Sequence, residues 1–186
     1  MVSANTRRNL NAHKYDLYRT HPIATRSALK AGVFAEDDVI YDPCNGLGGI
    51  TDALKMAGMI CHTSDKFDYD IDDTIVDFFD IEKIPKNVSA IVFNPPYKMT
   101  EEFIDNALRF CSRVIMFNRV SFLETVNRAE RIQSDWSLTD IYFHSFRVGC
   151  AKGFDDDYKN AVFYAWYIFD KRKYKGVTKC HWITKR

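Results

Sequence analysis

The sequence lacks most of the features that mark membrane, secreted and metal-binding proteins. Its 186 residues contain no apolar run long enough to cross a bilayer, and the polar N-terminal region has no apolar signal-peptide segment. The five cysteines are scattered and form no Cys-x-x-Cys pair, a pattern typical of neither a disulfide framework nor a zinc site. We therefore expect a cytoplasmic protein with reduced thiols and no metal.

Repeats, low-complexity segments and linkers rich in glycine, serine or proline are also missing. A chain of this length with 46% hydrophobic residues can bury a substantial core, so we expect one domain over residues 1–186. The net charge of +1 hides two basic ends, an N-terminal arm (1–20) and a C-terminal tail (171–186). Basic ends favour a polyanionic partner, with ordinary solvated charge as the alternative.

Short apolar runs alternate with amphipathic stretches along the first two thirds of the chain. Buried strands are predicted for residues 38–42, 59–64, 89–94 and 113–118. Helices are predicted for residues 49–58, which stop at Gly58, and for 100–111, where Thr100 is followed by acids in the first turn. This alternation predicts a doubly wound, mostly parallel α/β sheet covered by helices on both faces.

The last third of the chain changes character. The runs 138–146 and 160–170 are both strand-like, and no helical segment separates them. We expect them to pair antiparallel, because parallel strands need a longer crossover. This pattern predicts a C-terminal antiparallel hairpin, which a doubly wound nucleotide-binding fold usually lacks.

A glycine-rich turn follows the first predicted strand, in "YDPCNGLGG" (41–49). Asp42 ends the strand, and the glycines at 46, 48 and 49 let the backbone approach a ligand closely. The spacing matches neither the full dinucleotide fingerprint nor the Gly-Lys-Ser/Thr of a phosphate loop. A ligand-binding turn is one interpretation, and a mere tight turn is the other.

Carboxylates follow at two later positions. Asp65 ends the second predicted strand, where a carboxylate can accept hydrogen bonds from both hydroxyls of a ribose. Asp77 can accept from the amino group of an adenine while Phe78 packs against the face of its ring. Asp80 is a rival to Asp77, and core packing is the alternative for Phe78 or Phe79. Together with the glycine turn, these residues predict an adenosine-containing cofactor without phosphates.

The third predicted strand ends in the tetrapeptide Asn94-Pro95-Pro96-Tyr97, which suits a planar amine. The side-chain oxygen of Asn94 and the carbonyl of Pro95 can accept both hydrogens of an –NH2 group. This localises the lone pair of the nitrogen and directs it at an electrophile. Pro96 stiffens the turn, so both acceptors are fixed beforehand, and Tyr97 offers a ring for stacking.

With these motifs the chain resembles the class I S-adenosylmethionine-dependent methyltransferases that act on amino groups, particularly the adenine-specific DNA methyltransferases. The resemblance covers about residues 15–170, and its motifs follow the γ order. They are Thr20-His21-Pro22 with one inserted residue, Asp42-Pro43 with Gly46-x-Gly48, Asp65, Asp77-Phe78 and Asn94-Pro95-Pro96-Tyr97. The last predicted strand is similar to that of small phage-encoded members, which would place the protein in the host cytoplasm.

The resemblance implies a seven-stranded Rossmann-like sheet and S-adenosylmethionine as cofactor. The implied cofactor-binding residues are Pro22, Asp42, Pro43, Gly46, Gly48, Asp65, Asp77, Phe78 and Asn94. The implied reaction is direct methyl transfer to the 6-amino group of adenine in DNA, catalysed by residues 94–97 without a metal, with the flipped base stacked on Tyr97. The sequence has little room for the target-recognition domain usual in such enzymes. We therefore expect a single-stranded substrate, weak sequence selectivity or recognition by a partner.

Flanking contacts to the nucleic acid are expected from Arg147, Lys152 and Lys159, with ordinary surface charge as the alternative. Other acceptors for the methyl group also stay open. An unpaired adenine of RNA suits a small domain with basic ends. The tetrapeptide also occurs in enzymes that methylate a glutamine side chain of a protein. A subunit that binds S-adenosylmethionine without transferring its methyl group is a further alternative.

Overall fold

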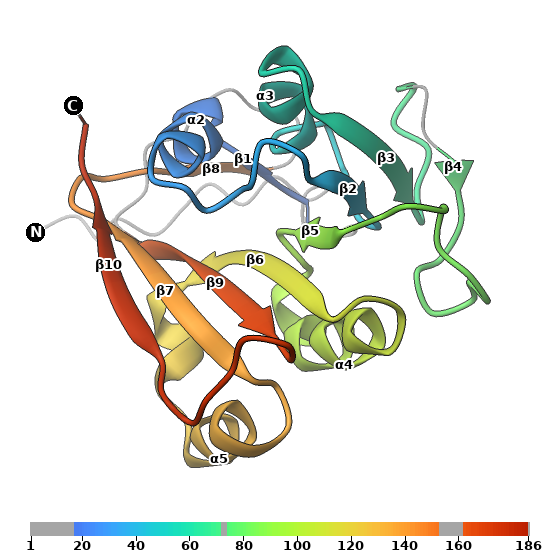
Figure 1. Ribbon diagram of the computed structural model, residues 1–186. Helices are drawn as coiled ribbons and strands as arrows, with labels where there is room; N and C mark the ends of the chain where they lie inside the picture. Colours follow the sequence, from blue (N-terminus) through green and yellow to red (C-terminus); the bar gives the residue numbers. More distant parts are fainter. Residues whose placement is uncertain (1–16, 72–73, 153–161, 186) are drawn as a thin grey trace, which may run out of the picture.

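One eight-stranded sheet forms the centre of the protein (Figure 1). The computed structural model describes residues 17–71, 74–152 and 162–185. The strands lie in the order β10-β7-β9-β6-β5-β2-β3-β4. Their bounds are β2 Val39–Asp42, β3 Ile60–Asp65, β4 Thr74–Ile75, β5 Ala90–Phe93, β6 Arg113–Arg119, β7 Leu138–His144, β9 Tyr164–Asp170 and β10 Lys179–Ile183. The sheet is the doubly wound Rossmann-like sheet that the sequence predicts.

Strands β2 to β6 pair in parallel, and β9 lies antiparallel between β6 and β7. The predicted antiparallel pairing of the last two apolar runs is therefore confirmed. The sheet has one strand more than expected, because residues 179–183 of the basic tail form β10, parallel to β7. Of these five residues only Ile183 is buried, and the apolar Cys180 and Trp182 are exposed, as an edge strand allows.

Helices cover both faces of the sheet (Figure 1). Helices α2 (Pro22–Lys30) and α3 (Thr51–Met56) pack against one face, while α4 (Thr100–Phe110) and α5 (Val126–Ser134) pack against the other. Strand β5 is buried on both faces, because Ile91 and Phe93 join the α4 side and Val92 joins the α2 side. None of the helices in the described residues is long and apolar enough to cross a membrane.

A second, two-stranded sheet lies beside the main one. Strand β1 (Tyr18–Thr20) pairs antiparallel with β8 (Cys150–Lys152), with Thr20 opposite Cys150. The end of the predicted N-terminal arm is therefore a strand, while residues 1–16 lie outside the described residues. Helix α2 follows directly, with Pro22 at its first position and the ring nitrogen Nδ1 of His21 accepting from the amide of Ile23 at 3.0 Å.

Candidate active site

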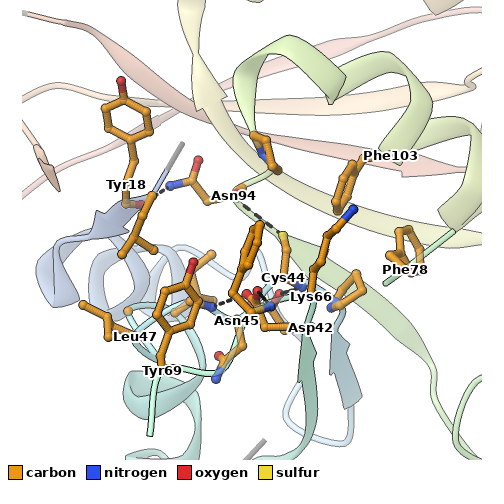
Figure 2. A pocket seen from close by; sticks show the side chains of 18 of the residues that line it. Tyr18, Asp42, Cys44, Asn45, Leu47, Lys66, Tyr69, Phe78, Asn94 and Phe103 are labelled. Carbon is orange, nitrogen blue, oxygen red and sulfur yellow. Dashed lines mark hydrogen bonds between the residues drawn. The ribbon is translucent and has the colours of Figure 1, made fainter. Parts of the chain in front are cut away.

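A cavity of about 390 Å³ opens at the carboxyl ends of β2, β3 and β5, the edge where parallel α/β sheets bind ligands (Figure 2). The loops after these strands and strand β1 line it. The predicted residues that line it are Asp42, Pro43, Gly46, Asp65, Asp77, Phe78, Asn94 and Pro96. The fold thus brings together most of the residues that the sequence assigns to the site.

The glycine turn after β2 is shaped by two different requirements. Gly46 has a φ of +57°, a left-handed conformation that favours glycine. Gly49 allows a close approach, because a side-chain carbon there would lie 2.7 Å from the carbonyl oxygen of Thr20. Gly48, although predicted to bind the cofactor, does not line the cavity, and it packs beside the carboxylate of Asp52. The turn therefore fits closely against β1.

Asp65, the last residue of β3, connects this strand to the glycine turn by a hydrogen bond. One carboxylate oxygen accepts from the amide of Gly46 and the other from the amide of Phe67, both at 2.9 Å. Each oxygen of an ionised carboxylate has two lone pairs and can accept more than one hydrogen bond. Asp65 is buried and borders the cavity.

The acidic loop after β4 forms another part of the wall. Asp77 lines the cavity, whereas Asp80 does not. The ammonium of Lys66 lies 2.6 Å from the carboxylate of Asp77, and the amide of Phe79 donates to it at 3.1 Å. Partial burial pulls the pKa of Asp77 upward, but these hydrogen bonds and the charge of Lys66 outweigh it, so the pKa lies below its usual value. Asp77 is therefore a carboxylate at neutral pH.

Phe78 is both a core residue and a cavity residue. Its side chain is 1% exposed, and its ring packs 5.3 Å from that of Phe103 on α4. Both rings border the cavity, together with the more exposed Phe79 (Figure 2). The predicted core packing of Phe78 and its predicted place at the cavity are therefore compatible.

The side-chain amide of Asn94 is held in one orientation by β1. Its nitrogen donates to the carbonyl oxygen of Tyr18 at 2.8 Å (Figure 2). It also donates to the hydroxyl of Thr20 at 3.1 Å, with the sulfur of Cys150 at 3.7 Å. A carbonyl oxygen only accepts hydrogen bonds, so the nitrogen must face β1 and the side-chain oxygen must face away. This buried oxygen has no donor among the described residues. The site thus presents a fixed hydrogen-bond acceptor.

Tyr97 does not line the cavity and packs on the α2 side of the sheet. Its hydroxyl lies 3.1 Å from that of Tyr164, and the guanidinium carbon of Arg119 lies 4.0 Å above the centre of its ring. The Tyr18 ring is 4.8 Å from the Tyr97 ring and 5.7 Å from the Arg119 guanidinium. Since this last distance is well below the sum of the other two, Arg119 and Tyr18 do not sandwich the Tyr97 ring.

The groups around Asn94 and Tyr97 are neutral or cationic. Burial raises the pKa of the Tyr97 and Tyr164 hydroxyls well above the usual range, and it raises that of the Cys150 thiol to about 11. Burial lowers the pKa of Arg119, but its tyrosine partners outweigh that effect, and the guanidinium stays charged. This side of the cavity therefore contrasts with the carboxylates on the other.

Several predicted residues lie away from the cavity lining. Pro22 is the first residue of α2. Pro95, which follows Asn94 in the sequence, is buried and does not line the cavity. Arg147 is exposed in the turn after β7, and Lys152 stands opposite Tyr18 on β8. Neither of these two basic residues lines the cavity, and Lys159 falls outside the described residues.

Much of the basic tail lies at the wrong edge of the sheet for a substrate contact. Strand β9 runs antiparallel to its neighbours, so the residues after Asp170 emerge at the edge opposite the cavity. Arg172 forms an ion pair with Asp170 at 3.2 Å, and the ammonium of Lys171 donates to the carbonyl of Leu108 at the end of α4. These cations therefore stabilise the fold locally.

The residues that surround Asn94 were not predicted from the sequence. Tyr18 and Thr20 stand just before the predicted Pro22 and line the cavity, whereas Pro22 does not line it. Arg119 ends β6 at the same sheet edge, and alternation along that strand places it on the face of Tyr164, its register partner. Cys150 belongs to a three-residue strand with no recognisable pattern.

No protein-family model and no curated protein sequence matches the chain. Solved structures resemble it in fold. A candidate RNA methyltransferase of Pyrococcus horikoshii has a TM-score of 0.56 at 13% identity, covering 80% of this chain and 83% of that one. The 23S rRNA methyltransferase ErmE has a TM-score of 0.54 at 16% identity, covering 80% and 67%.

A modification subunit of a candidate type I restriction enzyme from Vibrio vulnificus also resembles the chain, with a TM-score of 0.55 at 10% identity. The match covers 91% of this chain and 48% of that one. At these identities the similarity establishes the fold. The chain has the Rossmann-like sheet of methyltransferases, with its antiparallel C-terminal hairpin.

Proposed function

We propose that this protein transfers a methyl group from S-adenosylmethionine to the 6-amino group of adenine in DNA. The observation that carries the proposal is the side-chain oxygen of Asn94. It is buried, fixed by the bonds of its amide nitrogen to β1, and without a donor among the described residues. A buried acceptor without a partner costs free energy, so a fold retains one where a ligand supplies the donor.

The cavity suits the proposed cofactor in volume and in polar groups. S-adenosylmethionine carries ribose hydroxyls and an adenine amino group as donors and has no phosphates. Asp65 borders the cavity and would accept from the hydroxyls, and Asp77 would accept from the amino group beside the ring of Phe78. A volume of about 390 Å³ is within the range of small-molecule sites. When bound, this cofactor supplies a methyl group on a positively charged sulfur.

Asn94 and Pro95 would hold the amine that attacks. The Asn94 oxygen and the Pro95 carbonyl accept its two hydrogens, which leaves the nitrogen lone pair pointing at the methyl group. The fixed orientation of Asn94 means that no reorganisation is needed when charge develops on the nitrogen. Tyr97, which the motif assigns to stacking on the base, lies outside the cavity lining under the guanidinium of Arg119.

The charges near Asn94 favour a neutral planar amine. Arg119 is a cation, and Tyr97, Tyr164 and Cys150 are neutral at physiological pH because burial raises the pKa of each. An alkylammonium such as a lysine side chain would be repelled by this cation. The exocyclic amine of a nucleobase carries no charge and suits the site. Arg147 and Lys152 would contact the backbone phosphates outside the cavity.

RNA is the second candidate substrate. Two proteins of similar fold are named for RNA methylation, and a third is a subunit of a DNA-modifying enzyme. The acceptor chemistry is the same for an adenine in either polymer. The difference would come from contacts to the sugar, because only RNA carries the 2′-hydroxyl.

Methyl labelling of separate substrate pools tests the proposal. Purified protein is incubated with tritiated S-adenosylmethionine and with single-stranded DNA, duplex DNA, RNA or protein extract, and the labelled product is digested and identified by mass spectrometry. We expect label in DNA, as 6-methyladenine. Label confined to RNA adenine would favour the second candidate. Label on cytosine or protein, or none in any pool, would contradict the proposed function.

A further inference from the structure

Strand β1 touches both functional parts of the cavity through one residue. The backbone of Thr20 packs against Gly49 of the glycine turn, where a side-chain carbon would lie only 2.7 Å from its carbonyl oxygen. The hydroxyl of Thr20, which is 2% exposed, accepts a hydrogen bond from the amide nitrogen of Asn94 at 3.1 Å. Thr20 therefore links the predicted cofactor loop to the predicted amine acceptor.

The orientation of an asparagine amide depends on such contacts. A half-turn about the last side-chain bond exchanges the oxygen for the nitrogen at almost no steric cost, and it would replace the acceptor by a donor. Asn94 has two N–H bonds to place. The carbonyl of Tyr18 takes one, and the hydroxyl of Thr20 takes the other, with the Cys150 sulfur as a weaker neighbour. The carbonyl of Tyr18 disfavours the rotated amide because it can only accept, while the hydroxyl of Thr20 holds the plane of the amide at its other N–H.

We infer that Thr20 is a positioning residue, whose hydroxyl holds the Asn94 amide in place while the Tyr18 carbonyl directs its oxygen toward the target amine. The inference rests on the proposed function for its catalytic consequence. Thr20 does not touch the amine; it acts through Asn94. The backbone of Thr20 is held on two sides, by its pairing with Cys150 on β8 and by its contact with Gly49. These two contacts fix the position of the Thr20 hydroxyl.

Replacement of the hydroxyl by a methyl group tests this role. Thr20→Val keeps the shape of the buried side chain and removes its acceptor. We expect kcat to fall about tenfold, the scale of one lost hydrogen bond to a positioned group, while KM for the nucleic acid and the Kd of the cofactor stay within about twofold. Thr20→Ser, which restores the hydroxyl, should recover most of the lost kcat.

Thr25→Val is the matched control. Thr25 is a fully buried threonine on α2, and its hydroxyl has no hydrogen-bond partner among the described residues. The same change there should leave kcat at the wild-type value. An equal fall in Thr25→Val and Thr20→Val, or no fall in Thr20→Val, would overturn the positioning role.

Hydrogen exchange of the Asn94 side-chain amide gives a second readout that does not require activity. In protein labelled with ¹⁵N-asparagine, the Asn94 NH2 signals are identified by their loss in Asn94→Ala. We expect slow exchange in the wild type and in Thr25→Val, and faster exchange in Thr20→Val. Unchanged exchange in Thr20→Val would overturn the inference even if the enzyme is active. If the wild type methylates no pool, the proposed function fails separately, and this comparison still shows whether Thr20 holds the amide.

Discussion

The two sides of the cavity differ in charge and in how the chain builds them. The cofactor side carries the carboxylates Asp42, Asp65 and Asp77, each in or beside the loop after its own strand. The amine side carries neutral and cationic groups, and Asn94 is fixed there by residues 56 to 76 positions away in the sequence. The cofactor side is built from residues of local sequence motifs, whereas the amine side depends on contacts between residues far apart in the sequence. Perturbations of the two sides should therefore separate binding from turnover.

Asn94→Ala should show the largest effect. It removes the fixed acceptor, so methyl transfer should fall by on the order of a hundredfold to a thousandfold, as when one preorganised electrostatic contact is deleted. Cofactor affinity should change little, because the carboxylates lie on the other side of the cavity. Steady-state kinetics and calorimetry measure the two quantities. Asn127→Ala, an exposed asparagine on α5, is the control and should match the wild type.

Features of the fold and the site that depend on neighbouring residues can be predicted from the sequence, whereas those that depend on distant residues cannot. Local patterns predict helices α3 and α4 and strands β2, β3, β5, β6, β7 and β9, whereas α2 and α5 were not predicted. Local patterns also predict the loop carboxylates, because each acid ends or follows an apolar run. The residues that hold Asn94 do not follow from such patterns, because Tyr18, Thr20 and Cys150 reach it only after β1 and β8 pair. Strand β10 was missed for another reason: an edge strand buries little, so its sequence needs no apolar pattern.

Low pH should destabilise the folded protein, because His144 is buried in its neutral form. This residue ends β7 and is completely buried, and burial lowers its pKa to about 4. The unfolded chain therefore binds more protons than the folded one between pH 6.5 and 4, and stability falls as the pH drops through this window. The loss should reach about 3 kcal/mol at the lower end. Urea unfolding at several pH values should show this slope in the wild type.

The variant His144→Phe removes the titrating group and should flatten the slope of stability against pH in that window. Asp77 does not contribute there: its pKa is lowered from an ordinary value of 3.8, so its share of stability is lost only at more acidic pH. Parallel slopes in the wild type and in His144→Phe would contradict the assignment to His144.

Asp65→Ala should weaken cofactor binding by about 1–3 kcal/mol, because two ribose hydroxyls lose their acceptor and the glycine turn loses its tie to β3. Calorimetry with S-adenosylmethionine measures the change. The exposed Asp68, in the same loop, serves as the control, and Asp68→Ala should bind normally. Wild-type affinity in Asp65→Ala would move the ribose site elsewhere.

The smallest effect is expected from exposed cations. Arg147→Ala removes a charge that follows β7 at the cavity edge of the sheet, and the slope of log K against log salt for DNA binding should fall by about one unit or less. Lys173→Ala removes a charge at the opposite edge, after Asp170, and should leave the slope unchanged. Equal effects of the two variants would show that DNA binding does not distinguish the two edges.

A crystal structure with the demethylated cofactor and a short adenine-containing DNA strand tests the central claim most directly. The account predicts that the 6-amino nitrogen lies about 3 Å from the Asn94 side-chain oxygen, while the Asn94 nitrogen keeps its bonds to Tyr18 and Thr20. A base held by other residues would contradict the account, as would an Asn94 amide rotated so that its nitrogen faces the base.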